Sequence, residues 1–303
     1  MNPAIWGLLS AAGWGATDFI VRFTGRSVGH LNALLGTFLV GVVALTLVVL
    51  TVGTVALPAA SDLWLIGLAG ATTMMSTLLL YLGLVRGPIA VVAPIVSTFP
   101  AFNVAFSLAI GVRPSLLQWA AMGAVMAGTA ALALSSTEEE GADVPKKKLT
   151  AAGGPGIGET YDRAHVRRSA AIALAAAVLS AVTVAAGQTA AENTGELTTV
   201  WLARLVSLTL LGLLLLVKRE APRLPVALWP LILAQGILDS GAYLALLAGS
   251  HGEGKAIAVV VASTFSAITV LLAWAFLRER MKPPQWLGAG MVVLGVAALS
   301  GAG

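Results

Sequence analysis

The residues best suited to chemistry in this sequence are a few polar side chains inside long apolar segments. Asp239 stands about mid-way through the apolar stretch 226–249, with Gln235 four residues before it and Tyr243 four residues after it. In a helix this spacing puts all three side chains on one face. A carboxylate at that depth must line a cavity, pair with a base or carry a proton. We therefore predict Asp239 as a substrate or proton site; the alternative is a buried ion pair that only packs helices.

Arg204 is the other deeply placed charge of the same half, in the apolar stretch 197–217. At ~1.5 Å of helix rise per residue, it lies roughly 10 Å from the start of that stretch. It is the natural partner for Asp239 in a buried pair. Its planar guanidinium also suits an anionic substrate group, which makes Arg204 a predicted substrate-binding residue. The alternative is a side chain that extends toward the membrane interface.

A third charge lies in the first apolar segment, 3–21. Asp18 is four residues from Trp14 and four from Arg22, so the three side chains share a helix face. Trp14 and Asp18 are therefore predicted to line the substrate path, with Asp18 as a second candidate for proton coupling. The alternative is an Asp18–Arg22 pair at the interface that merely ends the helix.

No group of residues has the spacing of a metal or cofactor site. The chain contains no cysteine, which excludes thiol catalysis and thiolate ligands. His30, His165 and His251 are far apart and fit no zinc motif. The glycine-rich stretch 151–158 lacks the Lys-Ser/Thr ending of a phosphate-binding loop. We expect no metal and no cofactor.

The composition places these residues in a membrane protein. Hydrophobic residues make up 58% of the chain and charged residues 11%, against roughly 25% charged in soluble domains. The net charge of +4 comes from basic residues in short loops, so membrane topology explains it better than nucleic-acid binding. We expect a multi-pass protein of the cell membrane, plasma or inner, with the lipid bilayer and a small molecule as partners and no nucleic acid.

Ten apolar segments approach the roughly 20 residues that span a bilayer. They are 3–21, 31–52, 63–85, 88–110, 115–134, 169–190, 197–217, 226–249, 255–277 and 284–301. The region 135–168 is polar and charged, so we expect a disordered linker. The expected organisation is a five-helix repeat over 1–134, this linker, and a second five-helix repeat over 169–303.

The two halves repeat one another. A Ser-Thr-Phe tripeptide followed by Gln-Trp begins at Ser97 and Gln118 and recurs at Ser263 and Gln285. Because each unit has an odd number of helices, the second enters the membrane from the opposite side. The expected fold class is an all-α polytopic membrane protein with ten transmembrane helices in two inverted five-helix repeats. Such duplication is typical of secondary transporters, whose halves enclose a shared site.

The repeat adds four residues to the predicted site. Tyr81 aligns with Tyr243, so the two tyrosines are predicted on opposite walls of one cavity; the alternative is anchoring at the interface. Ser97 and Ser263 are expected mid-helix and are predicted to face the same cavity. Hydroxyls in membrane helices also bond to their own backbone one turn back, which is the alternative for both serines.

The distribution of charge orients the chain. Basic residues gather in the loops after the first, third, fifth, seventh and ninth segments, whereas the opposite loops hold only Arg113 and Lys255. The positive-inside rule then places the linker in the cytoplasm and both termini outside.

The layout resembles a known family. Two five-helix units, Trp14-Gly15, Pro94 and the Gln-Trp pairs at Gln118 and Gln285 resemble the EamA type of the drug/metabolite transporter superfamily. The resemblance implies a metabolite transporter, often an exporter, that works by alternating access. It also implies cytoplasmic termini in many relatives, opposite to the charge-based orientation. Arg204 is a departure from symmetry, because Gly36 stands at the matching place of the first half.

The last segment of each half carries small residues seven positions apart, Ala121 and Gly128 in one and Gly288 and Gly295 in the other. Such stripes allow close helix packing. The resemblance to small multidrug transporters, whose terminal helix dimerises through such spacing, implies a role in joining the two halves or two subunits, so that monomer and homodimer both stay open.

The sequence favours a secondary transporter for a small metabolite, an amino acid or similar amphipathic compound, working in efflux. One alternative is an intramembrane enzyme acting on a lipid-linked substrate, which would need a converging set of acid, base or metal ligands. The other is a non-transporting membrane scaffold or sensor. Because the sequence offers only scattered single acids, we expect that the protein is not an enzyme.

Overall fold

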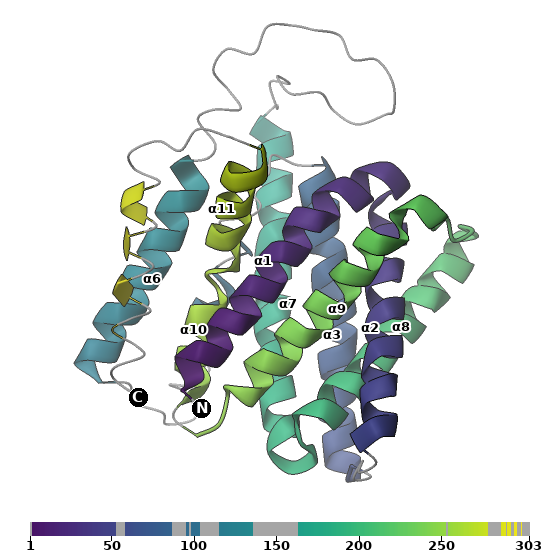
Figure 1. The fold of residues 1–303 in the computed structure, drawn as a ribbon, viewed down its shortest axis with the longest axis horizontal. Helices are drawn as coiled ribbons and strands as arrows, with labels where there is room; N and C mark the ends of the chain where they lie inside the picture. The colour runs from purple at the N-terminus through teal and green to yellow at the C-terminus, as the bar shows by residue number, and fades with distance from the viewer. Residues whose placement is uncertain are drawn as a thin grey trace, which may run out of the picture.

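The computed structural model describes residues 2–52, 58–86, 95–96, 98–103, 115–135, 163–252 and 254–277, and near the end 286–288, 290–291, 294–295 and 298. Every regular element in these residues is a helix (Figure 1). The predicted all-α class is thus confirmed for the described part of the chain. Most of the predicted linker, 135–168, lies outside the described residues, and its disorder stays a prediction.

The helices follow the predicted apolar segments closely. In the first half they are α1 (Pro3–Val28), α2 (His30–Val52), α3 (Ala60–Arg86) and α6 (Leu116–Ser135). In the second half they are α7 (Arg163–Thr194), α8 (Glu196–Lys218), a 3-10 turn η1 (Val226–Leu228), α9 (Trp229–Ala248), α10 (Gly254–Ala262) and α11 (Phe265–Leu277).

Six helices in the described residues are long and apolar enough to cross a membrane. They are Pro3–Val28, His30–Val52, Ala60–Gly83, Arg167–Thr194, Glu196–Lys218 and Val226–Ala248. The predicted segments 88–110 and 284–301 are described only in part. The count of ten therefore stays a prediction.

The ends of α1 show how local sequence sets a helix boundary. The Asn2 side chain accepts a hydrogen bond from the backbone N–H of Ala4 at 2.9 Å, and Pro3 occupies the first turn. At the other end Gly29 has φ +84°, which a glycine adopts without strain. The helix extends past residue 21, where the predicted segment ends, because Arg22 and Arg26 end the apolar run of the sequence but not the helix.

The predicted helix 255–277 is wrong in one respect, because it is broken. Ser263 and Thr264 form a turn between α10 and α11. Ser263 Oγ donates to Val260 O at 2.7 Å, and Thr264 Oγ1 donates to Val261 O at 2.8 Å. Hydroxyls that bond to carbonyls of the preceding turn compete with the helical ladder and bend it.

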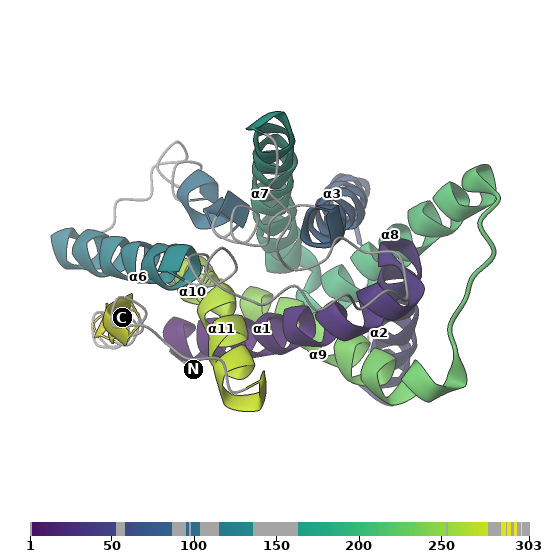
Figure 2. The ribbon, with the colours of Figure 1, turned by 90° about the horizontal axis from the view of Figure 1, so that it is seen from above.

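The two halves pack against each other in matching pairs. The most extensive helix contacts join α1 to α9 and α3 to α7, while α2 faces α8. The first helix of each half thus contacts the third helix of the other half, and the two second helices contact each other, as a two-fold relation requires. The α1–α2 and α7–α8 turns lie at opposite ends of the bundle in Figure 1, so the first hairpins of the halves run in opposite directions. Figure 2 shows α1 and α9 side by side.

Glycines let these helices approach closely. A Cβ on Gly15 of α1 would lie 2.7 Å from the carbonyl oxygen of Phe265. A Cβ on Gly295 would lie 2.6 Å from Val125 Cγ2 and 3.0 Å from the Ala121 carbonyl oxygen in α6. The predicted small-residue stripe therefore joins the last segments of the two halves within one chain.

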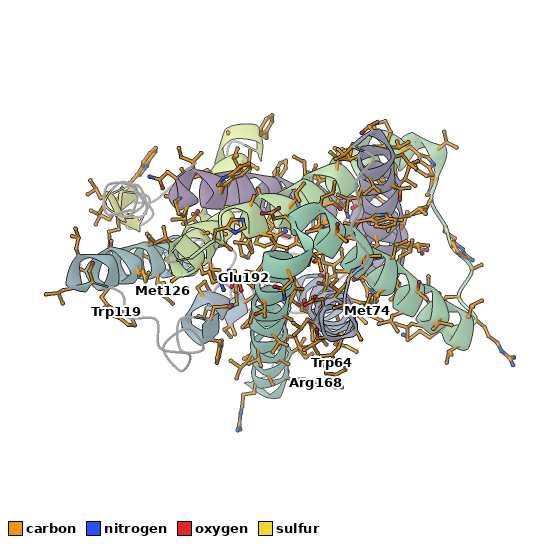
Figure 3. The ribbon with its side chains drawn as sticks, turned by 90° about the horizontal axis from the view of Figure 1, so that it is seen from below. Trp64, Met74, Trp119, Met126, Arg168 and Glu192 are labelled. Atoms are coloured by element: carbon orange, nitrogen blue, oxygen red, sulfur yellow. The ribbon has the colours of Figure 1, made fainter. Side chains whose placement is uncertain are left out.

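The outer surface is apolar, as a lipid-facing surface should be. Exposed hydrophobic side chains include Trp64 (68%), Leu216 (75%) and Val217 (81%). Figure 3 shows such side chains projecting around the bundle, with Trp64 and Trp119 on the periphery. A soluble protein rarely exposes this much contiguous apolar surface.

Candidate functional site

A cavity of about 100 Å³ lies between the two halves, and both halves contribute to its walls. Its lining combines aromatic rings, hydroxyls and three charged groups. The lining residues are Trp14, Thr17, Asp18, Thr73, Ser76, Thr77, Leu80, Tyr81, Val96, Phe99, Ser180, Thr183, Val184, Arg204, Asp239, Tyr243 and Phe265.

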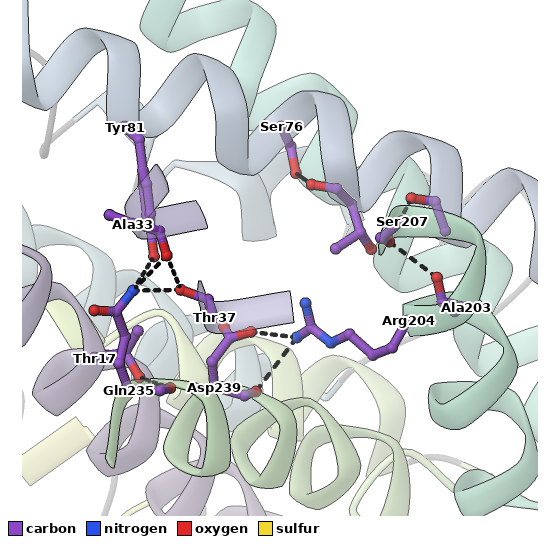
Figure 4. A network of polar contacts seen from close by, with 12 residues as sticks. Thr17, Ala33, Thr37, Ser76, Tyr81, Ala203, Arg204, Ser207, Gln235 and Asp239 are labelled. Carbon is purple, nitrogen blue, oxygen red and sulfur yellow. Dashed lines mark hydrogen bonds and ion pairs between the residues drawn. The ribbon is translucent and has the colours of Figure 1, made fainter. Parts of the chain in front are cut away.

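Arg204 and Asp239 form an ion pair in the cavity wall (Figure 4). The Arg204 Nη2 atom lies 2.6 Å from Asp239 Oδ2 and 3.5 Å from the Asp239 carbonyl oxygen. The guanidinium carbon also stands 5.2 Å from the centre of the Phe38 ring and 5.8 Å from that of Tyr243. Only 3% of the Arg204 side chain is exposed, so it does not extend toward the interface.

Trp14 of α1, from the first half, lines the same cavity as this pair. Arg204 Nε is buried and has no hydrogen-bond partner among the described residues. The two charges of the pair are thus matched within the protein, while the Nε donor has no partner among the described residues.

Asp18 lies half-buried in the cavity wall, on α1 one turn from Trp14. Its predicted alternative, an ion pair with Arg22, is not among the ion pairs of the described residues. The neighbouring Trp14 ring meets Phe265 edge-on, with centroids 6.3 Å apart. The structure therefore puts a carboxylate beside an aromatic wall.

The two equivalent tyrosines both reach the cavity. Tyr81 comes from α3 and Tyr243 from α9, and each is 2% exposed, so neither anchors the interface. The Tyr243 hydroxyl donates to the Thr183 carbonyl oxygen at 3.3 Å. The Tyr81 hydroxyl accepts a hydrogen bond from Gln235 Nε2 at 3.5 Å.

Gln235 belongs to the predicted polar stripe but does not line the cavity. It is fully buried and accepts a hydrogen bond from Thr24 Oγ1 at 2.8 Å. Its amide donates to the Ala33 carbonyl oxygen at 3.3 Å and to Thr37 Oγ1. Figure 4 shows this network beside the ion pair. Gln235 therefore fastens α9 to α1 and α2.

The repeated Ser-Thr-Phe motif contributes its phenylalanines to the cavity. Phe99 and Phe265 line it with ring centroids 6.5 Å apart. Ser263 is 1% exposed, bonds to its own backbone and is absent from the lining, which corrects its predicted mid-helix, cavity-facing position. Ser97 lies outside the described residues, and its role stays a prediction.

Sequence reasoning also missed a set of hydroxyls, namely Thr17, Thr73, Ser76, Thr77, Ser180 and Thr183. A signal for some of them was present. Thr73, Thr77 and Tyr81 are spaced four apart and align with Gln235, Asp239 and Tyr243 of the second half. The first half thus carries threonine where the second carries the acid. Gln188 bonds to Ser250 Oγ at 2.8 Å and does not line the cavity.

Comparison with known proteins agrees with this architecture. The EamA-like transporter family matches residues 1–134 and 167–301. A solved structure titled "Crystal structure of protein" has the same fold, with a TM-score of 0.72 and 19% identity, covering 98% of this chain and 95% of that chain. Curated protein sequences give no significant match. Since two matched regions, one in each half, account for most of the sequence, the chain belongs to the EamA-like transporter family, within the drug/metabolite transporter superfamily.

Proposed function

We propose that the chain is a secondary transporter that exports a small amphipathic metabolite, an amino acid or similar compound, by alternating access. The observation that carries this proposal is the polar, aromatic-lined cavity between the halves. Transport rather than catalysis is typical of the family. The proposed fold has ten transmembrane helices in inverted repeats, with 135–168 as a linker between units 1–134 and 169–303.

The lining suggests how such a compound would bind. Trp14, Phe99 and Phe265 form an aromatic side of the cavity for an apolar body. The Arg204–Asp239 pair, Asp18 and the two tyrosine hydroxyls provide the polar side. At about 100 Å³ the cavity is smaller than the roughly 300–1,000 Å³ pockets of drug-sized ligands. It therefore suits a compact metabolite.

The position of the cavity supports alternating access. Its walls come from α1, α3 and the segment with Val96 and Phe99 of one half, and from α7, α8, α9 and α11 of the other. A rocking of the halves against each other would change access to the cavity from each end while the binding residues stay near the middle. No nucleotide-binding motif occurs in the sequence, so we propose that a gradient supplies the energy, with proton coupling as one option.

Flux into proteoliposomes tests the proposal. The purified protein should give saturable uptake of at least one compound from a panel of amino acids, amines and other small amphipathic metabolites. Arg204→Ala should abolish that uptake, because it removes the cation of the cavity wall. Glu220→Gln, at an exposed residue far from the cavity lining, is the matched control. No saturable uptake of any compound would refute the proposal.

A further inference from the structure

The charges of the described residues that line the cavity do not cancel. Its lining includes Asp18, Asp239 and Arg204, that is, two carboxylates and one guanidinium. The stretch 87–112, of which only part is described, contains no Asp, Glu, Lys or Arg in the sequence. With all three groups ionised, the described lining of the cavity holds one net negative charge.

Arg204 is already engaged. Its guanidinium forms the 2.6 Å contact with Asp239 and lies over the Phe38 and Tyr243 rings. A substrate carboxylate could reach this guanidinium only from its Nε side or by displacing Asp239. Either way the cavity would hold a further carboxylate without a counter-charge of its own, which is strongly unfavourable. Arg204 Nε, which has no partner among the described residues, can serve a neutral acceptor without changing the charge balance.

Asp18 is the carboxylate in excess. It does not take part in the ion pairs of the described residues. Its neighbour Trp14 begins a row of rings, with Phe265 at 6.3 Å from Trp14 and Phe99 at 6.5 Å from Phe265. A cavity that combines a carboxylate with aromatic rings is an arrangement that receives an ammonium group joined to an apolar body.

We propose that the substrate is an organic monocation, an amine with an aromatic or similarly apolar body, whose ammonium group is bound by Asp18. The apolar body lies on the Trp14, Phe265 and Phe99 rings. This inference rests on the proposed transport function and narrows its substrate class. An amino acid is then a poorer substrate than the amine that lacks its carboxylate.

Three compounds that share one ring separate the possibilities: 2-phenylethylamine is a cation, phenylalanine is a zwitterion and 2-phenylethanol is neutral. Proteoliposome uptake and calorimetric binding to the detergent-solubilised protein should both favour the amine. The preference over each of the other two should be at least about tenfold, the loss expected when a charge-assisted hydrogen bond is missing. Equal or better binding of phenylalanine or 2-phenylethanol would overturn the proposal.

Variants assign the preference to Asp18. Asp18→Asn should lower amine binding by about 10- to 100-fold, with little effect on 2-phenylethanol. Asp18→Glu should keep the amine preference, which shows that the charge matters and that the protein still folds. Glu220→Gln should leave amine binding unchanged. Amine binding that survives in Asp18→Asn would contradict the assignment.

The outcomes also separate this inference from the proposed function. If the wild-type protein carries other metabolites of the panel but none of the three ring compounds, the transporter proposal stands and the monocation proposal fails. If the wild-type protein carries no compound at all, the transporter proposal itself fails.

Discussion

The contact between Arg204 and Asp239 joins α8 to α9 inside the cavity wall, away from water. Removing two charges from water costs several kcal/mol per ion, and close approach offsets this cost only in part. A pair that served packing alone could be exchanged for apolar side chains with little loss. A pair that belongs to the transport site could not be exchanged in this way without loss of transport. This difference distinguishes the functional role of Asp239 from its packing alternative.

Asp239→Asn should therefore destabilise the protein by about 3–5 kcal/mol, because it leaves the Arg204 guanidinium buried without a counter-charge. Arg204→Met combined with Asp239→Leu should recover most of this stability but no transport. Thermal unfolding in detergent and proteoliposome flux measure the two effects separately. A double variant that still transports would mean that the pair only packs helices.

At the scale of the helices, close backbone approach sets the geometry of the cavity. Gly70 of α3 faces α8, and a Cβ there would lie 2.6 Å from the Ala203 carbonyl oxygen and 2.7 Å from Val206 Cβ. Ala203 directly precedes Arg204, so this approach also positions the guanidinium. Gly67 lies one turn away on the same helix, and a Cβ there would meet nothing within 4 Å.

Gly70→Ala should lower stability by about 1–3 kcal/mol, because neither the backbone nor Val206 Cβ can move aside freely. Gly67→Ala should be neutral or stabilise by up to about 1 kcal/mol through helix propensity. Thermal unfolding of the two variants side by side is the measurement. Equal effects at both positions would show that α3 and α8 are not in close contact.

Polar contacts hold together one end of the bundle, where α7 meets α8 and α9 meets α10. Lys255 Nζ lies 2.5 Å from Glu192 Oε1, and His251 Nε2 lies 2.5 Å from Glu196 Oε1. Gln188 bonds to Ser250 beside them. These contacts connect the ends of neighbouring helices below the cavity, so they oppose opening at that end.

Lys255→Gln should favour opening at that end. Because the chain has no cysteine, a single Thr183→Cys reports access to the cavity through its labelling rate. Glu192 is partly exposed, and such pairs contribute about 0.2–1 kcal/mol, so labelling from that end should rise by up to about fivefold. Lys218→Gln, at the opposite end of α8, is the control. Unchanged labelling would show that the pair does not restrain the helices.

At the scale of the whole molecule, the sequence predicts those site residues whose side chains differ in polarity from their neighbours in the chain. Asp239, Arg204 and Tyr243 were found because polar residues in apolar sequence are conspicuous and their spacing implies one helix face. Phe99 and Phe265 were missed because a phenylalanine in an apolar segment looks the same whether it faces lipid, core or cavity. The break at Ser263 was missed for a related reason. Its cause is a hydroxyl that bonds locally, which an unbroken apolar run does not reveal.

The ends of the bundle also differ in charge. Arg22 and Arg26 at the end of α1, Lys218 at the end of α8 and Arg168 near the start of α7 lie at one end, which is the end of the α1–α2 turn in Figure 1. The opposite end carries acidic residues, among them Asp62, Glu192 and Glu196. Since basic residues are retained in the cytoplasm, the α1–α2 end is expected to face inward and the N-terminus outward.

Single cysteines at exposed helix ends test this orientation. Ser27 lies at the end of α1 and Thr51 at the far end of α2, so they report on opposite sides of the membrane. In intact cells a membrane-impermeant maleimide should label Thr51→Cys, whereas Ser27→Cys should react only after permeabilisation. The reverse pattern would place the termini in the cytoplasm, as the family resemblance implies.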